Sequence, residues 1–429
     1  MMNFLATFFE KLGKKRKRGS SLCVVCKGAR LLCGKKACPL LVRLYSQIKS
    51  SLLLRGNELN GSSPPSIFVG RAGYPKVYVG PLVPPIRGDT SIFDTPELWH
   101  GKTIQEIVDF RCLLVRGKAR VNVKDVENKF VEELQELALS KNSVTTELEF
   151  SKKPRQSIVL SDVVQPFGPS APVKNMKIFP ERTDHKIEKV YEDWDMKAED
   201  AVFWLYRKGV LVSKIQRAFS AGLLGVYRNR RLVPTRWSIT AVDDIISRRL
   251  LERVKQFPSI DEYRVYEHTY LDNRWIVLMI PSRWSYEQME AWYPGTTWNP
   301  GKKIWMISDW EGFEGRSDYA LTGGCYYSTR LAIAEYLERE SKQAAVVTFR
   351  EIHPGYILPV GVWFTRESIR KALKNKPKKF ESLTEALKYI STKLDIPVKE
   401  WVKNSCLLKG LIYQRKLVDF FKQLHPRNI

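Results

Sequence analysis

DDIISRRLLERVKQFPSIDEYRVYEHTYLDNRWIVLMI, residues 243–280, joins a helical pattern to a strand pattern. Its first part repeats apolar residues at helical spacing: Ile245, Ile246, Leu250, Leu251 and Val254. This spacing predicts an amphipathic helix over residues 243–257. Two runs rich in β-branched and aromatic residues follow, and they predict a hairpin of strands 263–270 and 275–280. A helix that leads into a hairpin, without a βαβ unit, is typical of an α+β protein.

The remainder of the chain mixes the same two patterns without regular βαβ alternation. Helices are predicted over residues 40–48, 103–110, 126–139, 198–208, 213–223, 326–340 and 383–394. Strands are predicted over residues 144–150, 344–352 and 356–364, with two short strands inside 66–85. Residues 57–65 have the composition of a linker, and residues 151–186, rich in Pro and basic residues, read as irregular. We therefore predict an α+β fold of mixed helices and antiparallel hairpins, with a small N-terminal four-cysteine zinc knuckle.

The composition excludes several classes of protein. The chain has 429 residues, of which 44% are hydrophobic and 11% aromatic, so it can build cores and is not globally disordered. No apolar run approaches the ~18 residues of a membrane span, so we expect no membrane partner. Apolar residues precede the charges at the start, the reverse of a secretory signal. We expect a cytoplasmic, nucleoid-associated protein, in which seven Cys do not form a disulfide scaffold.

The positive charge lies in three blocks. The chain carries a formal net charge of +25, and residues 1–50 hold 12 basic and 1 acidic residue. Residues 370–429 hold 15 basic and 5 acidic residues, and residues 207–253 hold 11 basic and 3 acidic residues. Separate basic blocks favour a polyanionic partner, and DNA is the expected one. A solvated basic surface is the alternative, and the amphipathic residues 1–12 leave a membrane surface as a weaker one.

Four of the seven cysteines lie within 16 residues in the pattern Cys23-x2-Cys26-x6-Cys33-x4-Cys38. Thiolates at this spacing bind zinc tetrahedrally, and lysines and an arginine between the ligands offset their negative charge. Metal would supply most of the folding energy of so small a knuckle. An iron–sulfur cluster is the alternative, because a Pro follows Cys38, and a disulfide pair is a further one. Zinc is the predicted cofactor.

The C-terminal sequence Gln414-Arg-Lys-Leu417-Val-Asp-Phe420-Phe421 fits the pattern Q-x-x-L-x-x-F-F. On one helical turn Leu417, Phe420 and Phe421 share a face and form an apolar plug, with Gln414 at its rim. The pattern resembles the motif by which replication and repair proteins dock on the sliding clamp, PCNA. An ordinary terminal helix packed on its own domain is the alternative, because helix-in-groove docking uses the same spacing.

Two further segments are candidate phosphate sites. In Gly70-Arg-Ala-Gly-Tyr-Pro-Lys76, Arg71 and Lys76 accompany a Gly-rich turn whose N–H groups can face a phosphate, although a plain hairpin turn also fits. Residues 227–240 combine arginine forks with the stacking faces of Tyr227 and Trp237. The arginines concerned are Arg228, Arg230, Arg231 and Arg236.

Residues 240–244 extend the second segment into the central helix. We expect Thr240 to cap that helix, with Asp243 and Asp244 in its first turn. Two acidic residues there either bind Mg²⁺ or interact favourably with the helix dipole.

The sequence as a whole resembles the archaeal Nre family of DNA repair proteins. The stretches that carry the resemblance are CVVCKGARLLCGKKACP, PSIFVGRAGYPKVYVGP, VPTRWSITAVDD and QRKLVDFF. The resemblance implies repair of DNA damage through the sliding clamp, and it carries over no catalytic residues. The alternative function is an enzyme that processes nucleotides or DNA phosphoesters with the arginine-rich segment and a nearby carboxylate.

These observations predict five regions. They are a basic flexible arm (1–20), the zinc knuckle (21–56), a basic first part of the α+β body (66–260), a second part (261–408) and a clamp-binding tail (409–429).

Overall fold

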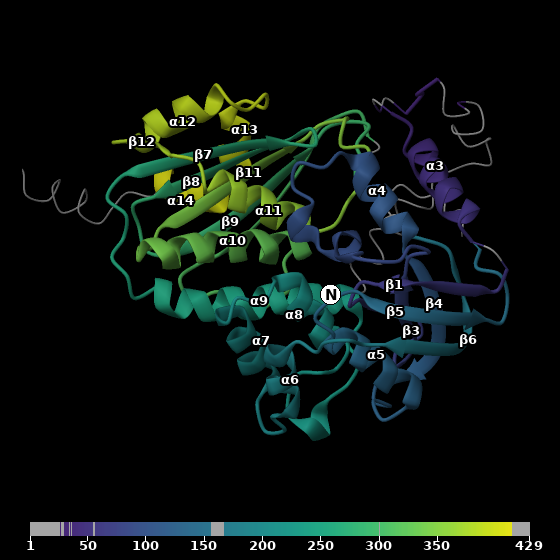
Figure 1. Cartoon of the computed structure of the whole chain (residues 1–429). Helices are drawn as coiled ribbons and strands as arrows, with labels where there is room; N and C mark the ends of the chain where they lie inside the picture. The colour runs from purple at the N-terminus through teal and green to yellow at the C-terminus, as the bar shows by residue number, and fades with distance from the viewer. Residues whose placement is uncertain are drawn as a thin grey trace, which may run out of the picture.

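The computed structural model describes residues 26, 30–33, 35, 37–54, 56–155, 167–299 and 301–413. Two six-stranded mixed sheets form its framework, and the longest described helices lie between them (Figure 1). The prediction of an α+β fold is confirmed. The knuckle is described only in part, because Cys23 and several residues between the other cysteines lie outside these ranges.

The first sheet comes from the first half of the chain. Its order is β1 (Glu58–Ser63), β5 (Val144–Phe150), β6 (Ser170–Phe179), β4 (Val115–Asn122), β3 (Lys76–Val83) and β2 (Ile67–Val69). Neighbouring strands are antiparallel except β4 and β6, which pair in parallel. The predicted pair of strands inside 66–85 is confirmed as β2 and β3.

The second sheet contains the predicted hairpin. Its order is β10 (Trp305–Glu311), β9 (Ser285–Trp292), β11 (Ala345–Ile352), β8 (Asn273–Ile280), β7 (Tyr263–Tyr270) and β12 (Lys378–Phe380). Leu271 and Asp272 join β7 to β8 with φ angles of 47° and 56°, the left-handed conformation of a tight hairpin turn. Here β9 and β11 are the parallel pair.

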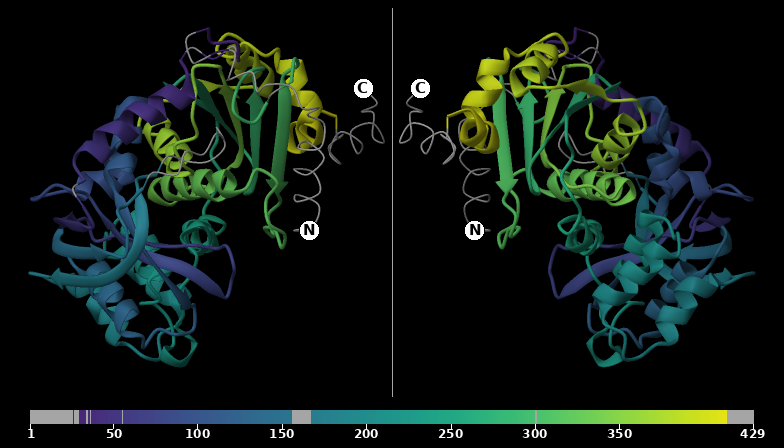
Figure 2. Two further views of the ribbon diagram at one scale, coloured as in Figure 1. Left: turned by 90° about the vertical axis from the view of Figure 1, so that its right-hand side faces the viewer. Right: turned by 90° about the vertical axis from the view of Figure 1, so that its left-hand side faces the viewer.

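Helices α10 and α11 pack on one face of the second sheet, and α12, α13 and α14 pack on the other. The described helices are α3 (Pro39–Leu52), α4 (Ile104–Leu113), α5 (Lys129–Leu139), α6 (His185–Glu192), α7 (Ala198–Arg207), α8 (Val212–Ser220), α9 (Thr235–Val254), α10 (Gly324–Glu340), α11 (Trp363–Ala372), α12 (Leu383–Ser391), α13 (Val398–Asn404) and α14 (Cys406–Tyr413). Short 3-10 turns lie at η1 (Ser91–Asp94), η2 (Pro96–Leu98) and η3 (Tyr227–Asn229). Figure 2 shows the sheet between α10 and α11 on one side and the yellow C-terminal helices on the other.

Alternate residues of β8 belong to different cores. Trp275, Val277 and Met279 face a core that runs through α9 and α10 to the first sheet. Ile276, Leu278 and Ile280 face a second core beneath α12, α13 and α14. This accounts for the uninterrupted apolar run of β8, because a strand covered on both faces needs no polar alternation. The predicted division of the body near residue 260, in the loop between α9 and β7, stays a prediction.

Four expectations about local structure were wrong. Residues 57–65 are not a linker, since β1 pairs with β5 there, and the supposedly irregular 151–186 contains β6 and the start of α6. Residues 356–364 do not form a strand; they run as a buried loop into α11. The central helix α9 begins at Thr235, so Thr240 is not its cap. None of the described helices combines the length and apolar character needed to cross a membrane.

Candidate nucleic-acid interface

The predicted Gly-rich turn connects β2 to β3. Gly70 N–H donates to the Tyr78 carbonyl at 2.8 Å, and Lys76 N–H donates to the Gly73 carbonyl at 2.9 Å. Gly73 has a φ of 79°, which favours glycine. The backbone is thus fixed by the hairpin itself, while Arg71, Tyr74 and Lys76 extend outward as exposed side chains.

The start of α9 lies beside this turn. Val69 N–H donates to Thr235 Oγ1 at 2.9 Å, which joins β2 to the first residue of the helix. The next two residues, Arg236 and Trp237, are exposed. The ring of Trp237 meets that of Tyr74, with 5.2 Å between centroids and a tilt of 51°. The structure therefore brings together parts of the two predicted phosphate sites, 160 residues apart in the chain.

Two residues that sequence reasoning missed extend this surface. Tyr78 of β3 is directly opposite Arg120 of β4 in the antiparallel register, and both side chains are exposed. Arg120 also lies beside the turn, since its Nη2 would be 3.7 Å from a Cβ added at Gly73. We call this set the basic–aromatic surface: Arg71, Tyr74, Lys76, Tyr78, Arg120, Arg236 and Trp237. In the sequence, Arg120 could be recognised only as an outward-facing residue of a strand. Its place in a binding surface becomes evident once the register puts Tyr78 opposite.

The other arginines of the second segment lie on η3 and the loop after it. Arg228 and Arg231 are exposed. Arg230 is only 7% exposed and donates to the carbonyls of Gly225 at 2.8 Å and Asp193 at 3.0 Å. Its guanidinium is therefore used to hold this loop, and we leave Arg230 out of the candidate interface.

The adjacent aspartates are engaged inside the fold. Asp243 accepts from Arg366 Nη1 at 2.8 Å and from Gln216 Nε2 at 2.9 Å, and Asp244 pairs with Arg330. Burial raises the pKa of the Asp243 carboxyl to about 6. These pairs join α9 to α8, α10 and α11, so neither the helix dipole nor Mg²⁺ is needed to explain the two acids. Both carboxylates are paired with arginines, so these aspartates do not support the alternative function of an enzyme that uses a nearby carboxylate.

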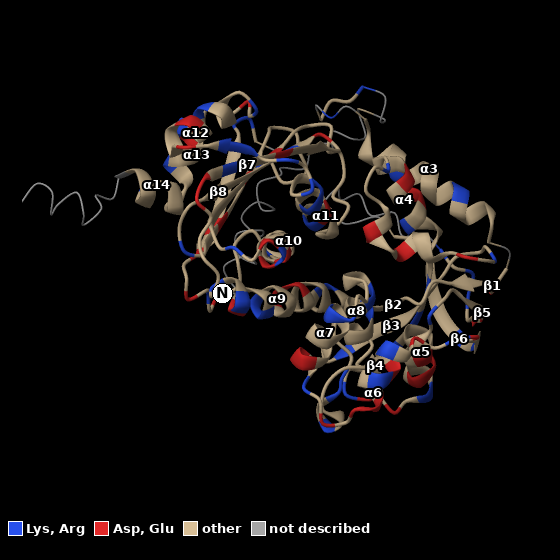
Figure 3. Cartoon of the chain, turned by 60° about the vertical axis from the view of Figure 1, so that its left-hand side comes forward, with Lys and Arg blue, Asp and Glu red and all other residues tan. Residues whose placement is uncertain are grey.

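Charge alone does not single out one face of the molecule. Figure 3 shows that basic residues occur along both halves of the chain and are interspersed with acidic ones. What distinguishes the basic–aromatic surface is the combination of exposed cations with exposed rings.

The cysteine cluster leads into α3. Of the predicted ligands, Cys26 is buried, Cys33 is exposed and Cys38 is half-buried directly before Pro39. Cys23 lies outside the described residues. Helix α3 is tied to α4 by Ser46 and Lys49, which contact Asp109 at 2.5 and 3.0 Å. This contact fixes the C-terminal end of the predicted knuckle on the body.

Among the described residues, Glu351, His353 and Asp395 have their ligand atoms close enough together to hold a metal ion. Arg274 already pairs with Asp395, and its Nη1 lies 4.0 Å from Glu351. The Glu351 carboxylate also accepts from the backbone N–H groups of Asp395 and Ile396. Both carboxylates are thus already paired or hydrogen-bonded within the fold, which favours a structural role for this cluster.

The predicted clamp motif, Gln414, Leu417, Phe420 and Phe421, lies outside the described residues. In the described part of the chain, helix α14 runs to Tyr413, the residue before the motif. The start of α14 is held by Glu287 of β9, whose carboxylate accepts from Ser405 Oγ and from the N–H groups of Cys406 and Leu407 at 2.5, 2.8 and 3.0 Å. The motif therefore follows an anchored helix.

Comparison with known proteins yields two family models that match the chain. One, "Archaeal Nre, N-terminal", matches residues 32–299, and the other, "Archaeal Nre, C-terminal", matches residues 311–420. The chain belongs to the archaeal Nre family. This confirms the resemblance noted in the sequence. The basic–aromatic surface lies within the N-terminal Nre region, and α14 lies within the C-terminal one.

Three curated Nre proteins are similar over most of their length. The chain is 45% identical over 388 residues to the DNA repair protein NreB of Archaeoglobus fulgidus, which covers 90% of this chain and 97% of that relative. It is 40% identical to the DNA repair protein NreA of the same organism, over 88% of this chain and 95% of that relative. It is 35% identical to the DNA repair protein NreA of Haloferax volcanii, over 86% of this chain and 90% of that relative. No solved structure matches the chain.

Proposed function

We propose that this Nre protein is a DNA repair factor that binds nucleic acid through the basic–aromatic surface and docks on the sliding clamp through its C-terminal motif. Relatives named DNA repair proteins support the first part. The observation that carries the binding site is the contact between Tyr74 and Trp237, two exposed rings flanked by Arg71 and Arg236.

The chemistry of this surface suits a strand of DNA. Tyr74 and Trp237 are each 45% exposed, although water is a poor environment for rings of this size. Bases stack on such rings without sequence preference, because every base has a π-face. Arginine forks match phosphate oxygens and keep their charge at any physiological pH. The surface therefore offers stacking and phosphate contacts side by side, as proteins that bind single strands do.

The experiment that tests the binding site replaces Trp237 by Ala. Stacking on one aromatic ring contributes about 1–3 kcal/mol per base, so affinity for a labelled single strand falls by about tenfold or more. The readout is fluorescence anisotropy at fixed salt. The melting temperature stays nearly unchanged, because Trp237 lies on the surface.

A matched control exists on the second sheet. Trp310 of β10 is 46% exposed, almost the same as Trp237, and lies outside the proposed surface. The Trp310→Ala variant keeps the affinity of the unaltered protein. Equal losses in both variants, or no loss in Trp237→Ala, would remove the basic–aromatic surface from the proposal.

The clamp-binding part rests on the motif and on the anchored helix before it. The sequence spacing of Leu417, Phe420 and Phe421 is that of one helical face, and Glu287 of β9 holds the start of α14, which precedes them. An anchored base with a short apolar end matches the way peptide tails are inserted into a groove of a partner.

We further propose one zinc ion bound by Cys23, Cys26, Cys33 and Cys38. The compact spacing of the four thiols, with cations between them, supports it. Zinc would fold the knuckle, and α3 connects the knuckle to the body beside α4.

A further inference from the structure

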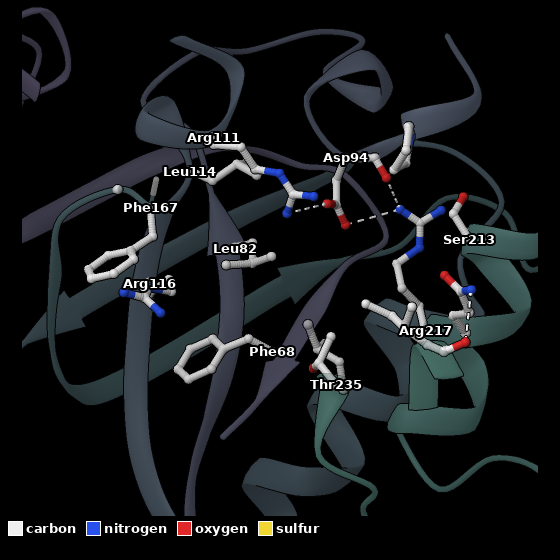
Figure 4. Close-up of a pocket in the computed structure, with 15 residues that line it drawn as sticks. Phe68, Leu82, Asp94, Arg111, Leu114, Arg116, Phe167, Ser213, Arg217 and Thr235 are labelled. Atoms are coloured by element: carbon white, nitrogen blue, oxygen red, sulfur yellow. Dashed lines mark hydrogen bonds and ion pairs between the residues drawn. The ribbon is translucent and has the colours of Figure 1, made fainter. Parts of the chain in front are cut away.

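A cavity of about 240 Å³ lies between the first sheet and α4, α8 and α9. Its charged lining consists of three arginines and one aspartate: Arg111, Arg116, Arg217 and Asp94. These charges leave a formal net of +2 in a pocket whose other lining residues are uncharged. Figure 4 shows Arg111 and Arg217 pointing toward Asp94, while Arg116 lies apart from them beside Phe68 and Phe167.

The arginines are unequally neutralised. Asp94 is shared, since its carboxylate lies 3.5 Å from Arg111 Nη1 and 3.2 Å from Arg217 Nη1. No described carboxylate pairs with Arg116, whose guanidinium lies 3.9 Å from the ring centre of Phe167 and 5.4 Å from that of Phe68. Burial without a countercharge lowers the pKa of Arg116 to about 10. A buried cation in this state favours an anionic ligand.

The backbone contacts of the next two residues, Gly168 and Pro169, fix the position of Phe167. A Cβ at Gly168 would come within 2.1 Å of the Leu114 carbonyl oxygen, so only glycine allows this close approach. Arg116 N–H then donates to the Pro169 carbonyl at 2.8 Å, which fixes the segment along β4. These contacts place Phe167 against the guanidinium.

Two buried arginine donors of the pocket have no hydrogen-bond partner among the described residues: Arg116 Nε and Arg217 Nε. Arg217 is 8% exposed. Leaving such donors unpaired in the interior is unfavourable, because each has lost its hydrogen bond to water. Both residues line the same cavity, which favours a ligand that accepts hydrogen bonds.

We propose that this pocket binds the phosphate monoester of a nucleotide. A phosphate monoester carries a charge of about −1.5 to −2 and three acceptor oxygens, which match the net charge and the unpaired donors. A phosphodiester within a strand carries only one negative charge and leaves the pocket under-neutralised. Leu82, Phe68 and Phe167 supply an apolar wall for the nucleoside.

The pocket adjoins the basic–aromatic surface. Phe68 and Thr235 line the pocket, and the next residues along β2 and α9 lead to Arg71 and to Arg236. The bond from Val69 N–H to Thr235 Oγ1 holds the two sides together at this boundary. A phosphorylated strand end is therefore one source of the monoester, and this source rests on the proposed function. A free mononucleotide is the other, and it does not.

The test compares ligands on the unaltered full chain. Calorimetry is run with deoxyadenosine 5′-monophosphate, with deoxyadenosine and with sulfate. Anisotropy is run with one oligonucleotide bearing a 5′-phosphate, a 3′-phosphate or only hydroxyl ends. We expect the monophosphate to bind and the nucleoside not to bind, and a phosphorylated end to raise affinity by about tenfold. Binding of the mononucleotide without an end preference identifies the free nucleotide as the source.

Variants assign the effect to the pocket. In Arg116→Gln the gain from phosphate is lost, while affinity for the hydroxyl-ended oligonucleotide is kept. Arg182→Gln, at an exposed arginine outside the pocket, retains the gain. If Arg116→Gln does not fold, Arg116→Lys keeps the charge but removes the Nε donor, and it weakens monophosphate binding by about fivefold.

Two results would overturn the proposal. One is that the monophosphate binds no better than the nucleoside or sulfate and that all three ends bind equally. The other is a phosphate gain that survives in a folded Arg116→Gln protein. Failure of the DNA-binding proposal gives a different result. In that case Trp237→Ala binds all three oligonucleotides as tightly as the unaltered protein does, and the affinity for the mononucleotide says nothing about it.

Discussion

The Nε2 atoms of His100 and His268 lie 3.0 Å apart. One ring donates a hydrogen bond to the other only if one of these two nitrogens carries a proton and the other does not. Burial, the neighbouring His100 and Lys371 lower the pKa of His268 to about 4. The pKa of His100 is also lowered, by burial and by Lys371 and Lys374. The pair is therefore neutral in the folded protein near pH 7.

This pair predicts a loss of stability in acid. The unfolded chain takes up the proton near the ordinary pKa of about 6.5, above the folded value. Stability is thus complete above pH 6.5 and is lost as the pH falls toward 4. The loss amounts to roughly 1–2 kcal/mol, after allowance for partial exposure of the rings. Denaturant unfolding of the unaltered protein and of His268→Gln should show a smaller dependence on pH in the variant; parallel curves would show that the pair does not titrate as described.

The zinc proposal concerns four single residues. Protein purified without added metal should contain about one zinc per chain by elemental analysis. Cys33→Ser should lose the metal, whereas Cys406→Ser, at an exposed thiol outside the cluster, should keep it. Iron with visible absorption would replace zinc by an iron–sulfur cluster, and metal-free protein would contradict both.

At the scale of elements, the C-terminal tail gives the sharpest prediction. Replacing Phe420 and Phe421 by Ala removes two aromatic anchors worth about 2 kcal/mol or more each, so calorimetry should no longer detect binding to purified sliding clamp. Leu411→Ala, at an exposed apolar residue of α14, is the matched control and should bind normally. The melting temperature should not change in either variant. A large fall for the Phe pair would place these rings in the protein's own core.

Elements with a strong local signal were predictable from sequence, and elements that depend on partners were not. The β7–β8 hairpin was predicted because both strands and their turn carry local signals. By contrast, β1 has the composition of a linker and becomes a strand by pairing with β5, whose partner residues lie 81–91 positions further along the chain. Residues 356–364 are apolar enough for a strand, but Gly355, Pro359 and Gly361 punctuate a buried loop.

At the scale of the whole molecule, the candidate sites depend on long-range contacts. Arg71, Lys76 and Arg236 were found from composition, yet nothing local indicated that Tyr74 and Trp237 meet. The arginine pocket was missed altogether. Arg111, Arg116 and Arg217 come from α4, β4 and α8, and no motif links them. Such a site becomes visible only when the first sheet and the helices beside it are packed together.

The central claim is that the basic–aromatic surface contacts the phosphates of DNA, and the salt dependence of binding tests it most directly. The observed association constant for a single strand is measured over a range of salt concentrations, for the unaltered protein and for Arg71→Gln/Arg236→Gln. Each phosphate contact on a single strand contributes about 0.7 to the slope of log K against log salt. The account predicts a slope lower by about 1.4 in the double variant, together with weaker binding. An unchanged slope and affinity would contradict it.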